Sequence, residues 1–381
     1  MRYFLLRMKR FCGYVAGFVF FISGILKLMD PVGASLVMKE YFHFLHIGFM
    51  DFSAMTAGIF FSLAECTIGA GLITGVWRWV IAPVSIGFQS LFTLITLLLV
   101  VFNPKMDCGC FGEAIHLTHA ETFTKNLILL ALLLIYYIPA RQLGETRKKK
   151  YVSFGLVTVS VIAFAVYSLL YLPLNDYTDY HAGVSLKGET SAADAYQAVF
   201  TYEKDGVQEK FTIDNLPDNS WTFVSTETVM TEEADGDSAT LSFHDKDGVY
   251  ADSLALKGKV IIVSVYDTEL NEKEKGKIVA FMKRSEEAGF KTLLLSSTEM
   301  DLPHYIADYK TLITLNRSNG GATYINDGFI AGKWAKKSLP TQDELAKISQ
   351  EDVTESIIGN SRSSLAFQGF LLYVFAVMLL L

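Results

Sequence analysis

Residues 80–102 read VIAPVSIGFQSLFTLITLLLVVF, a run of 23 residues without a charged side chain. A helix that crosses the hydrocarbon core of a bilayer needs about 20 mostly apolar residues, so this run predicts a membrane span. Five further apolar segments occur at 14–28, 54–76, 125–140, 151–172 and 365–381. The sequence therefore predicts an α-helical polytopic membrane bundle, with the lipid bilayer as its first partner.

The composition agrees with a membrane protein. Of the 381 residues, 51% are hydrophobic and 19% are charged, whereas soluble globular proteins carry about 25% charged residues. The net charge of −7 is unevenly distributed: residues 1–172 hold 14 Lys and Arg against 8 Asp and Glu, and the rest hold 19 against 32. This composition argues against a disordered or an entirely soluble chain. The region after residue 172 is acidic, so nothing indicates nucleic acid as a partner.

Cations in the short loops predict the orientation of the spans. The short loops on one side of the predicted spans, 30–53 and 103–124, hold only two cations, Lys39 and Lys105. Ten cations share the other side: Arg2, Arg7, Lys9, Arg10, Arg78, Arg141, Arg147, Lys148, Lys149 and Lys150. Because short loops rich in Lys and Arg stay cytoplasmic, we predict a bacterial inner-membrane protein with both termini cytoplasmic and residues 173–364 periplasmic.

The two ends of the chain each allow a second interpretation. The first segment could be a cleaved signal peptide, with Val32-Gly33-Ala34 as the cleavage site, but the apolar stretch 11–28 is long for a signal core. The last segment stops at Leu381 without a flanking cation. This pattern indicates that the natural chain can extend further.

The outer region begins with residues 173–240, which read as short strands and turns, with strands near 198–202, 209–213 and 221–225. In residues 241–352 the pattern is clearer. An apolar strand at 260–266, a helix at 272–288 closed by Gly289, and a strand at 292–296 predict a right-handed βαβ unit. An apolar segment at 312–315 follows. A hairpin of 322–325 and 329–334 and a capping box at 341–344 complete the series.

Two stretches of this region resemble thioredoxin-like domains of the TlpA type. FHDKDGVYADSLALKGKVIIVSVY (243–266) is similar to the entry into their first core strand, and NGGATYINDGFIAGKW (319–334) is similar to their late hairpin. The resemblance implies an α/β thioredoxin-like domain at 241–352. It also implies a C-x-x-C pair after the first strand and a cis-proline before the hairpin.

This chain departs from that family at both positions. It has DTELNE at 267–272 and Gly320-Gly321-Ala322 before the hairpin, and residues 111–381 contain no cysteine. A thiolate is the nucleophile of disulfide exchange, so the outer domain cannot carry out that chemistry alone. We expect a degenerate module that binds or positions a partner; another α/β sandwich is the alternative.

All four cysteines lie in the membrane half. Cys12, near the inner face, is interpreted as a packing residue or a lipidation site. Cys108-Gly109-Cys110 falls in the second outward loop, where an oxidising compartment permits a disulfide. The C-x-C ring is tight, strained disulfides are more easily reduced, and Gly109 relieves part of the strain because it lacks a Cβ. We expect an exposed, redox-active pair, with a structural disulfide or a metal site as alternatives.

The metal alternative depends on His116 and His119. With Cys108 and Cys110 they offer two thiolates and two imidazoles, a set that suits zinc or cuprous copper. Their spacing matches no common finger pattern, so we assign no metal site.

Glu65 is the one acid within a predicted span, about 16 Å below the outer boundary by helical rise. An intramembrane carboxylate is costly unless protonated or paired, so it is a functional candidate. Gln89 could hydrogen-bond to it, Cys66 lies about 100° around the helix, and Lys27 is expected to extend to the interface. Two interpretations stay open: a neutral acid bonded to a neighbouring helix, and a proton site for quinone or disulfide chemistry or part of a substrate path.

These motifs form a set: Ser23-Gly24 with Lys27 and Asp30-Pro31 in the first span, Glu65 with Gly69 in the second, and DCGCFG at 107–112. The set resembles the DoxX-related methylamine utilisation MauE family over residues 8–142, which implies a four-helix core. The resemblance further implies a role in maturing an amine dehydrogenase subunit by disulfide formation beside a thioredoxin-like partner. DoxX relatives imply quinone-coupled oxidation. No residue indicates methylamine itself as a substrate.

The predicted domains are a MauE/DoxX-like membrane domain (8–142), a fifth transmembrane helix (151–172), a β-rich segment (173–240), a thioredoxin-like domain lacking C-x-x-C (241–352) and a C-terminal helix (365–381). The favoured function is a thiol-disulfide or quinone-linked redox and maturation factor. Its candidate catalytic residues are Cys108, Cys110, Glu65 and Cys66, of which the resemblance supports the first three and, more weakly, Lys27.

Membrane quinone is the one cofactor considered, and thioredoxin-like or client proteins at the outer face are the candidate protein partners. The alternative function is a non-enzymatic membrane assembly protein, in which the C-x-C disulfide only shapes a loop and the outer domain recruits partners. A transporter is a weaker option because the spans show no inverted repeat.

Overall fold

The chain forms two compact units. The helical unit comprises Met1–Tyr177 and Ser361–Leu381, and the sheet unit comprises Thr178–Asn360. The structure is a computed structural model that describes residues 2–137, 146–187, 196–204, 207–212, 217, 221–230, 238–267, 270–351 and 353–380. Parts of the sequence predictions lie outside these residues, namely 138–142, Ile213, Thr268, Glu269 and Leu381.

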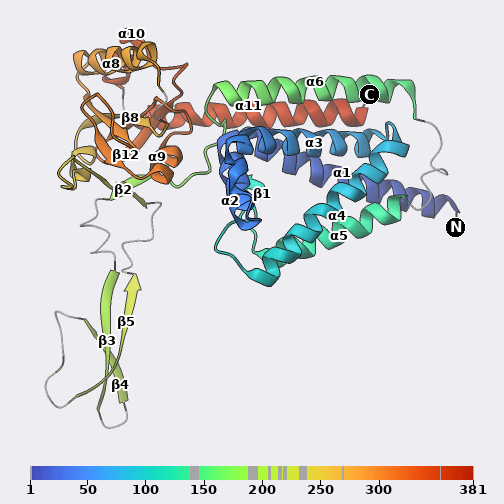
Figure 1. Ribbon diagram of the computed structural model, residues 1–381, viewed down its shortest axis with the longest axis horizontal. Coiled ribbons are helices and arrows are strands. Elements are labelled where there is room, and N and C mark those ends of the chain that lie inside the picture. Colours follow the sequence, from blue (N-terminus) through green and yellow to red (C-terminus); the bar gives the residue numbers. More distant parts are fainter. Residues whose placement is uncertain are drawn as a thin grey trace. The chain divides into compact units, whose positions relative to one another are not determined.

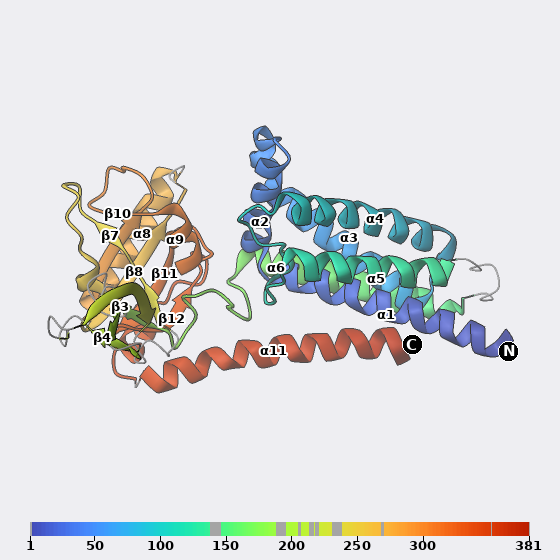
Figure 2. The same cartoon turned by 90° about the horizontal axis from the view of Figure 1, so that it is seen from below.

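The helical unit contains long helices that match the predicted spans (Figures 1 and 2). Its elements are α1 (Arg2–Met29), α2 (Pro31–Phe44), the 3-10 helix η1 (Gly48–Ser53), α3 (Ala54–Thr74), α4 (Arg78–Phe102), β1 (Cys110–Glu113), α5 (His119–Tyr137), α6 (Lys148–Leu170) and, from Ser361 onward, α11 (Val353–Leu380). Five described stretches are long and apolar enough to cross a membrane: Arg7–Met29, Gly48–Thr74, Arg78–Phe102, His119–Tyr137 and Lys148–Leu170. The sixth predicted span falls in α11, whose apolar part, Leu365–Leu379, is shorter.

Helix α2 was not expected, because residues 30–53 were interpreted as a loop. Asp30 ends α1 and caps α2: its side chain accepts a hydrogen bond from the backbone N–H of Gly33 at 2.9 Å, and Pro31 occupies the first helical position. A side-chain acceptor followed by proline is a typical helix start. The Asp30-Pro31 pair therefore joins two helices rather than opening a loop.

Helices α1 and α3 approach each other closely, because small residues line the contact. A Cβ on Gly69 would lie 2.6 Å from the carbonyl oxygen of Gly17, and a Cβ on Gly24 would lie 2.6 Å from the sulfur of Cys66. Glycine at such crossings lets the backbones of transmembrane helices touch. The close approach brings the middle of α3, including Glu65, against the C-terminal half of α1.

The outer surface of the helical unit is apolar, and its interior contains polar side chains. Leu94 and Val101 of α4 are 56% and 67% exposed, and Val159 of α6 is 66% exposed. Inside, Gln89 of α4 donates to the carbonyl of Asn126 at 3.2 Å, and the Asn126 amide donates to Thr96 at 3.2 Å. Apolar surfaces with buried polar contacts are typical of helices in lipid, and this arrangement agrees with a multi-pass membrane protein.

Helices α6 and α11 lie side by side (Figure 1). Ser153 of α6 donates to the carbonyl of Val377 at 2.7 Å, and the rings of Phe164 and Phe370 stack with centroids 4.8 Å apart. Val161 and Val374 are buried in the same core as residues of α1 and α3. The pair therefore packs against the rest of the helical unit.

The sheet unit is built on an eight-stranded mixed sheet with the order β6-β2-β12-β11-β8-β9-β10-β7. The strands are β2 (Ser185–Lys187), β6 (Ser238–Thr240), β7 (Phe243–His244), β8 (Lys259–Val265), β9 (Lys291–Ser296), β10 (Tyr305–Ala307), β11 (Gly321–Asn326) and β12 (Phe329–Trp334). Strands β8 and β9 are parallel and are joined through α8 (Glu272–Glu287), whereas β11 and β12 form an antiparallel hairpin. The predicted βαβ unit and hairpin are therefore present in the structure.

Alternating residues of β8 fill two cores, one on each face of the sheet. Ile261 and Val263 pack with Phe281 of α8 and with Leu345 of α10 (Gln342–Ile348). Val260 and Ile262 pack instead with Leu312 of α9 (Tyr309–Leu315) and with Ala255 of the 3-10 helix η5 (Asp252–Ala255). The predicted apolar segment 312–315 is thus the end of a helix, and both faces of the sheet are covered (Figure 1).

A separate three-stranded antiparallel sheet has the order β4-β3-β5. Its strands are β3 (Tyr196–Lys204), β4 (Val207–Thr212) and β5 (Thr222–Met230). The ring of Tyr202 contacts Phe211 and Phe223 edge-on, with centroids 5.8 and 5.7 Å away. The three strands expected in this part of the chain are therefore present and longer than predicted.

Candidate functional site

The C-x-C loop, Cys108-Gly109-Cys110, leads into β1 beside α2. Gly109 has φ of +56°, and a Cβ at this position would clash with the side chain of Val37 on α2. Only glycine meets both conditions, since other residues rarely adopt positive φ and all carry a Cβ. The loop backbone therefore lies directly against the Val37 side chain of α2.

The two loop cysteines differ in exposure. All four cysteines of the chain carry free thiols in the structure. Cys108 is only 3% exposed, whereas Cys110 is half-buried. The expectation of an exposed pair is therefore wrong for Cys108, because α2 lies next to the loop where the sequence was interpreted as another loop.

A side-chain hydroxyl group lies against the carbonyl oxygen of each loop cysteine. The phenol of Tyr41 on α2 donates to the carbonyl of Cys108 at 2.7 Å. The hydroxyl oxygen of Ser23 on α1 lies 2.6 Å from the carbonyl oxygen of Cys110. The loop is thus held from two helices, with one contact on each side of Gly109.

Glu65 is paired inside the bundle. The Lys27 ammonium contacts Glu65 Oε1 at 2.6 Å, with side-chain exposures of 13% and 6%, and the Ser23 hydroxyl lies 2.7 Å from Glu65 Oε2. Lys27 therefore does not extend to the interface as expected. The sequence gives the depth of Lys27 along its helix. It does not show that Glu65 on the facing helix binds the ammonium in place of interfacial water.

The hydrogen bond expected between Gln89 and Glu65 is absent from the described structure. The Gln89 amide donates to the carbonyl of Asn126 rather than to Glu65. Cys66 lies on another side of α3, with its sulfur 3.8 Å from the carbonyl oxygen of Phe21. Cys66 is fully enclosed at the α1–α3 contact, and its catalytic role stays a prediction.

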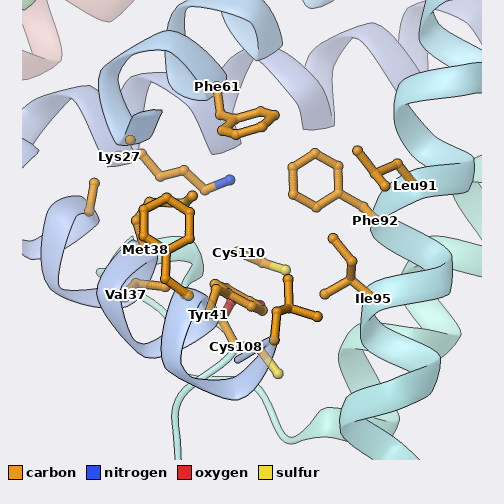
Figure 3. A pocket seen from close by; sticks show the side chains of 15 residues that line it. Lys27, Val37, Met38, Tyr41, Phe61, Leu91, Phe92, Ile95, Cys108 and Cys110 are labelled. Atoms are coloured by element: carbon orange, nitrogen blue, oxygen red, sulfur yellow. The ribbon is translucent and has the colours of Figure 1, made fainter. Parts of the chain in front are cut away.

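An apolar cavity of about 170 Å³ lies between α2, α3, α4 and the C-x-C loop (Figure 3). Both loop cysteines and Lys27 line it, and Figure 3 shows the Lys27 nitrogen and the Cys110 sulfur directed toward its centre. The Lys27 nitrogen also lies 5.6 Å from the ring centroid of Phe92. The remaining lining residues are Ala34, Val37, Met38, Tyr41, Phe42, Leu45, Gly58, Phe61, Leu91, Phe92, Ile95 and Gly109.

A second, smaller cavity of about 30 Å³ lies behind Cys110 and is bordered by Ser23, Lys27, Glu65 and Lys125. Lys27, Phe92 and Cys110 border both cavities. These residues therefore form the wall between the apolar cavity and the buried acid.

Burial sets the protonation of the two groups around the carbonyl of Cys108. Burial raises the pKa of the Cys108 thiol, so the thiolate is a minor form at neutral pH. Burial, together with the neighbouring thiols, also raises the pKa of Tyr41 well above its ordinary value, which keeps the phenol protonated as a donor. Reactivity in thiol chemistry follows the thiolate and its accessibility. Cys110 is therefore the more accessible of the two sulfurs.

The structure does not assemble the histidine and cysteine donors of the metal alternative. His119 donates to the carbonyl of Met106 at 2.9 Å, and His116 lies 3.5 Å from Asp107. Among the residues that the structure describes, no group of three or more His, Cys, Asp or Glu side chains is arranged to hold a metal ion.

In the sheet unit, the position after β8 forms a helix start. Asn271 accepts a hydrogen bond from the backbone N–H of Glu274, and Glu274 accepts one from the backbone of Asn271, so the two residues form a capping box. Asn319 bonds to the backbone of Tyr266 and Asp267. Polar contacts thus occupy the place where the resemblance implied two cysteines.

Sequence reasoning missed Ser23 and Tyr41 as site residues. Ser23 could have been found, because Ser23 and Lys27 are four residues apart and share one face of α1. Tyr41 gave no signal, since the segment that carries it was not recognised as a helix.

Comparison with protein families finds a match for the first part of the chain. Residues 2–139 match the family of methylamine utilisation protein MauE. This segment holds the C-x-C loop, Ser23, Lys27, Tyr41 and Glu65. Residues 196–233, which include β3, β4 and β5, match a domain of unknown function (DUF8463). No curated protein and no solved structure matches the chain.

Proposed function

We propose that this protein is a MauE-like membrane thiol-disulfide oxidoreductase that matures client proteins through Cys108 and Cys110. The observation that carries the proposal is that both loop cysteines border one apolar cavity, beside a buried Lys27–Glu65 pair. Strained disulfides are the labile and catalytic ones. A disulfide between residues 108 and 110 is such a bond, because its ring spans only one intervening residue.

In the oxidising half-cycle, a client thiolate attacks the sulfur of Cys110 in the Cys108–Cys110 disulfide. Cys108 leaves as a thiolate and takes up a proton, which its raised pKa favours. The second client thiolate then displaces Cys110 from the mixed disulfide. The client gains one disulfide, and this chain keeps two thiols together with the two protons that the client has lost.

A membrane quinone is the oxidant that we infer for the return step. The two thiols give two electrons and two protons to the quinone, which becomes a quinol while the Cys108–Cys110 disulfide forms again. A cavity of about 150 Å³ lined by apolar residues can hold benzene, and the cavity here is of that size and is flanked by the rings of Phe61 and Phe92. The Lys27 ammonium at its wall favours the negative charge that a ring acquires on reduction.

We further propose that the protein lies in a bacterial inner membrane with both termini cytoplasmic and residues 173–364 periplasmic. The ten cations on one side of the spans support this orientation. The sheet unit would then be a cysteine-free, thioredoxin-like module that docks the client or a redox partner. Its βαβ unit followed by a hairpin supports that assignment.

Thiol trapping in cells tests the proposal. Cells expressing the chain are quenched with acid and labelled with a maleimide that adds mass, with and without quinone synthesis. We expect the Cys108–Cys110 disulfide to dominate in the presence of quinone and the dithiol to accumulate in its absence. A pair that stays in one state under both conditions contradicts redox cycling.

The competing function, a non-enzymatic assembly protein, predicts that a Cys108→Ser, Cys110→Ser double variant keeps full activity at normal abundance. Our proposal predicts loss of client oxidation at unchanged abundance. Cys12→Ser is the matched control, because Cys12 is buried in α1, away from the C-x-C loop in the sequence.

A further inference from the structure

Ser23 lies between two oxygen atoms that both accept hydrogen bonds. Its hydroxyl oxygen is 2.7 Å from Glu65 Oε2 and 2.6 Å from the carbonyl oxygen of Cys110. Ser23 and Glu65 are both buried. A serine hydroxyl carries a single proton, and an ionised carboxylate and a carbonyl have none to give. For both short contacts to be hydrogen bonds, a second proton is therefore needed besides that of the Ser23 hydroxyl.

Protonation of Glu65 supplies that proton. When Glu65 is neutral, its O–H donates to the Ser23 oxygen, the Ser23 hydroxyl donates to the Cys110 carbonyl, and Lys27 still donates to Glu65 Oε1. When Glu65 is ionised, the Ser23 proton is drawn to the carboxylate, since hydrogen bonds to a charged acceptor are stronger. The carbonyl of Cys110 then faces an oxygen lone pair at 2.6 Å, a contact that the loop relieves by moving away.

We propose that Ser23 is a positioning residue that relays the protonation state of Glu65 to the C-x-C loop. The loop is held at Cys110 when Glu65 carries a proton and is released when Glu65 is ionised. The inference rests on the proposed thiol-disulfide function only for its consequence, namely that the redox equilibrium of the pair depends on this proton. Such linkage is reciprocal, so oxidation or reduction of the pair changes the proton affinity of Glu65.

Charged and titratable groups face Glu65 from several elements. Lys27 from α1 contacts it at 2.6 Å, and Lys125 from α5 borders the same small cavity. Cys66 is its neighbour in sequence on α3, and Cys110 of β1 borders the cavity. The Tyr41 contact with Cys108 stays in place in both states, because the phenol remains a donor. Release of Cys110 therefore moves the Cys110 side of the loop, while the Cys108 side stays bonded to Tyr41.

Equilibration with glutathione tests the relay. Reduction of a protein disulfide by glutathione exchanges thiols for thiols, so below the thiol pKa values its equilibrium constant does not depend on pH unless another group is linked to it. For the purified full-length chain we expect the constant to change by about fivefold between two plateaus, the worth of one hydrogen bond. Ser23→Ala removes the relay and Glu65→Gln mimics the neutral acid.

Both variants are expected to abolish the pH dependence of the equilibrium constant, but each keeps the value of a different plateau. Glu65→Gln keeps the value of the acidic plateau, because the amide donates to Ser23, and Ser23→Ala keeps the value of the alkaline plateau. Ser23→Thr keeps the hydroxyl and is therefore expected to show the pH dependence of the original chain. A merely structural role of Ser23 would not require this result. If Ser23→Ala retains the pH dependence of the original chain, the relay is wrong even though the pair is redox-active.

A failure of the proposed function is recognised separately. If Cys108 and Cys110 form no disulfide in any glutathione buffer, the redox proposal is wrong, and the relay is judged from the reduced protein. The rate at which Cys110 is alkylated, relative to its own thiolate fraction, then reports the loop directly. We expect a step with pH in the original chain and none in Ser23→Ala or Glu65→Gln; a step that persists in both variants overturns the relay.

Discussion

The Lys27 ammonium and the Glu65 carboxylate lie 2.6 Å apart across helices α1 and α3. The two side chains are in direct contact, and both are largely enclosed. Removing one partner of a buried pair leaves an uncompensated charge, whereas removing both leaves none. The pair is therefore a structural requirement of the α1–α3 contact as well as part of the site.

We expect Lys27→Met to destabilise the helical unit by about 3–5 kcal/mol. The double variant Lys27→Met, Glu65→Gln is expected to recover most of that loss, because no buried charge remains. Thermal unfolding in detergent, followed by loss of the monodisperse peak, measures both. Lys105→Met, at an exposed lysine, serves as the control. Equal instability of the single and double variants would show that Lys27 acts through packing alone.

The pKa of Cys108 predicts a specific pH dependence. Burial raises this pKa in the folded chain, so the folded state holds the thiol proton more tightly than the unfolded state does. Alkylation of Cys108 by iodoacetamide should therefore lag behind an ordinary thiol at neutral pH and accelerate at higher pH than usual. Stability contributed by the neutral thiol is lost as the pH rises above the unfolded value. Peptide-resolved mass spectrometry measures the rate of Cys108 alkylation at each pH.

In that experiment Cys110 is the internal comparison, since it is half-buried while Cys108 is enclosed. We expect Cys110 to react first at every pH at which the chain is folded. Denaturation in detergent should bring the two rates together. Equal rates in the folded protein would contradict the enclosure of Cys108 by α2.

Gly109→Ala tests the close approach of the loop to α2. The positive φ and the clash with Val37 should together cost about 1–3 kcal/mol. Adding Val37→Ala removes the clash and leaves the backbone strain, so it should recover part of the loss. Gly155→Ala is the control, because a Cβ there meets open space on a helix. Full tolerance of Gly109→Ala in thermal unfolding would show that the loop is not pressed against α2.

Tyr41→Phe tests the contact on the other side of the loop. The variant keeps the ring but leaves the carbonyl of Cys108 without its donor, which should cost about 1–3 kcal/mol. We also expect faster alkylation of Cys108, because the loop is no longer held to α2. Tyr137→Phe, at an exposed tyrosine, is the control. An unchanged alkylation rate would place the hold on Cys108 elsewhere.

The sequence predicted the elements of the fold better than their contacts. Apolar runs marked the spans because a helix that faces lipid must be apolar along its whole length. The continuous apolar run of β8 marked the sheet core, and the residues between 322–325 and 329–334 marked its hairpin, since these patterns depend only on local geometry.

The contacts of the site were less accessible to sequence reasoning. The depth of Glu65 was readable, but its partner depends on how α1 and α3 rotate toward each other, and this follows from the packing of Gly17, Gly24 and Gly69. Cys108 was expected at the surface because the helix that encloses it was interpreted as a loop. A closer look at Asp30-Pro31, a typical cap followed by proline, would have predicted that helix.

Helix α1 ends at Met29 and α2 begins at Pro31, so the single residue Asp30 joins the helix that holds Ser23 and Lys27 to the helix that holds Tyr41. A joint this short lets α2 swing about one pivot but prevents it from sliding along α1. Tyr41 both lines the apolar cavity and bonds the carbonyl of Cys108, so a swing of α2 that widened the cavity would strain that bond. Admission of a guest molecule and loosening of the loop would therefore be one and the same movement, and a stiffer pivot would slow both together.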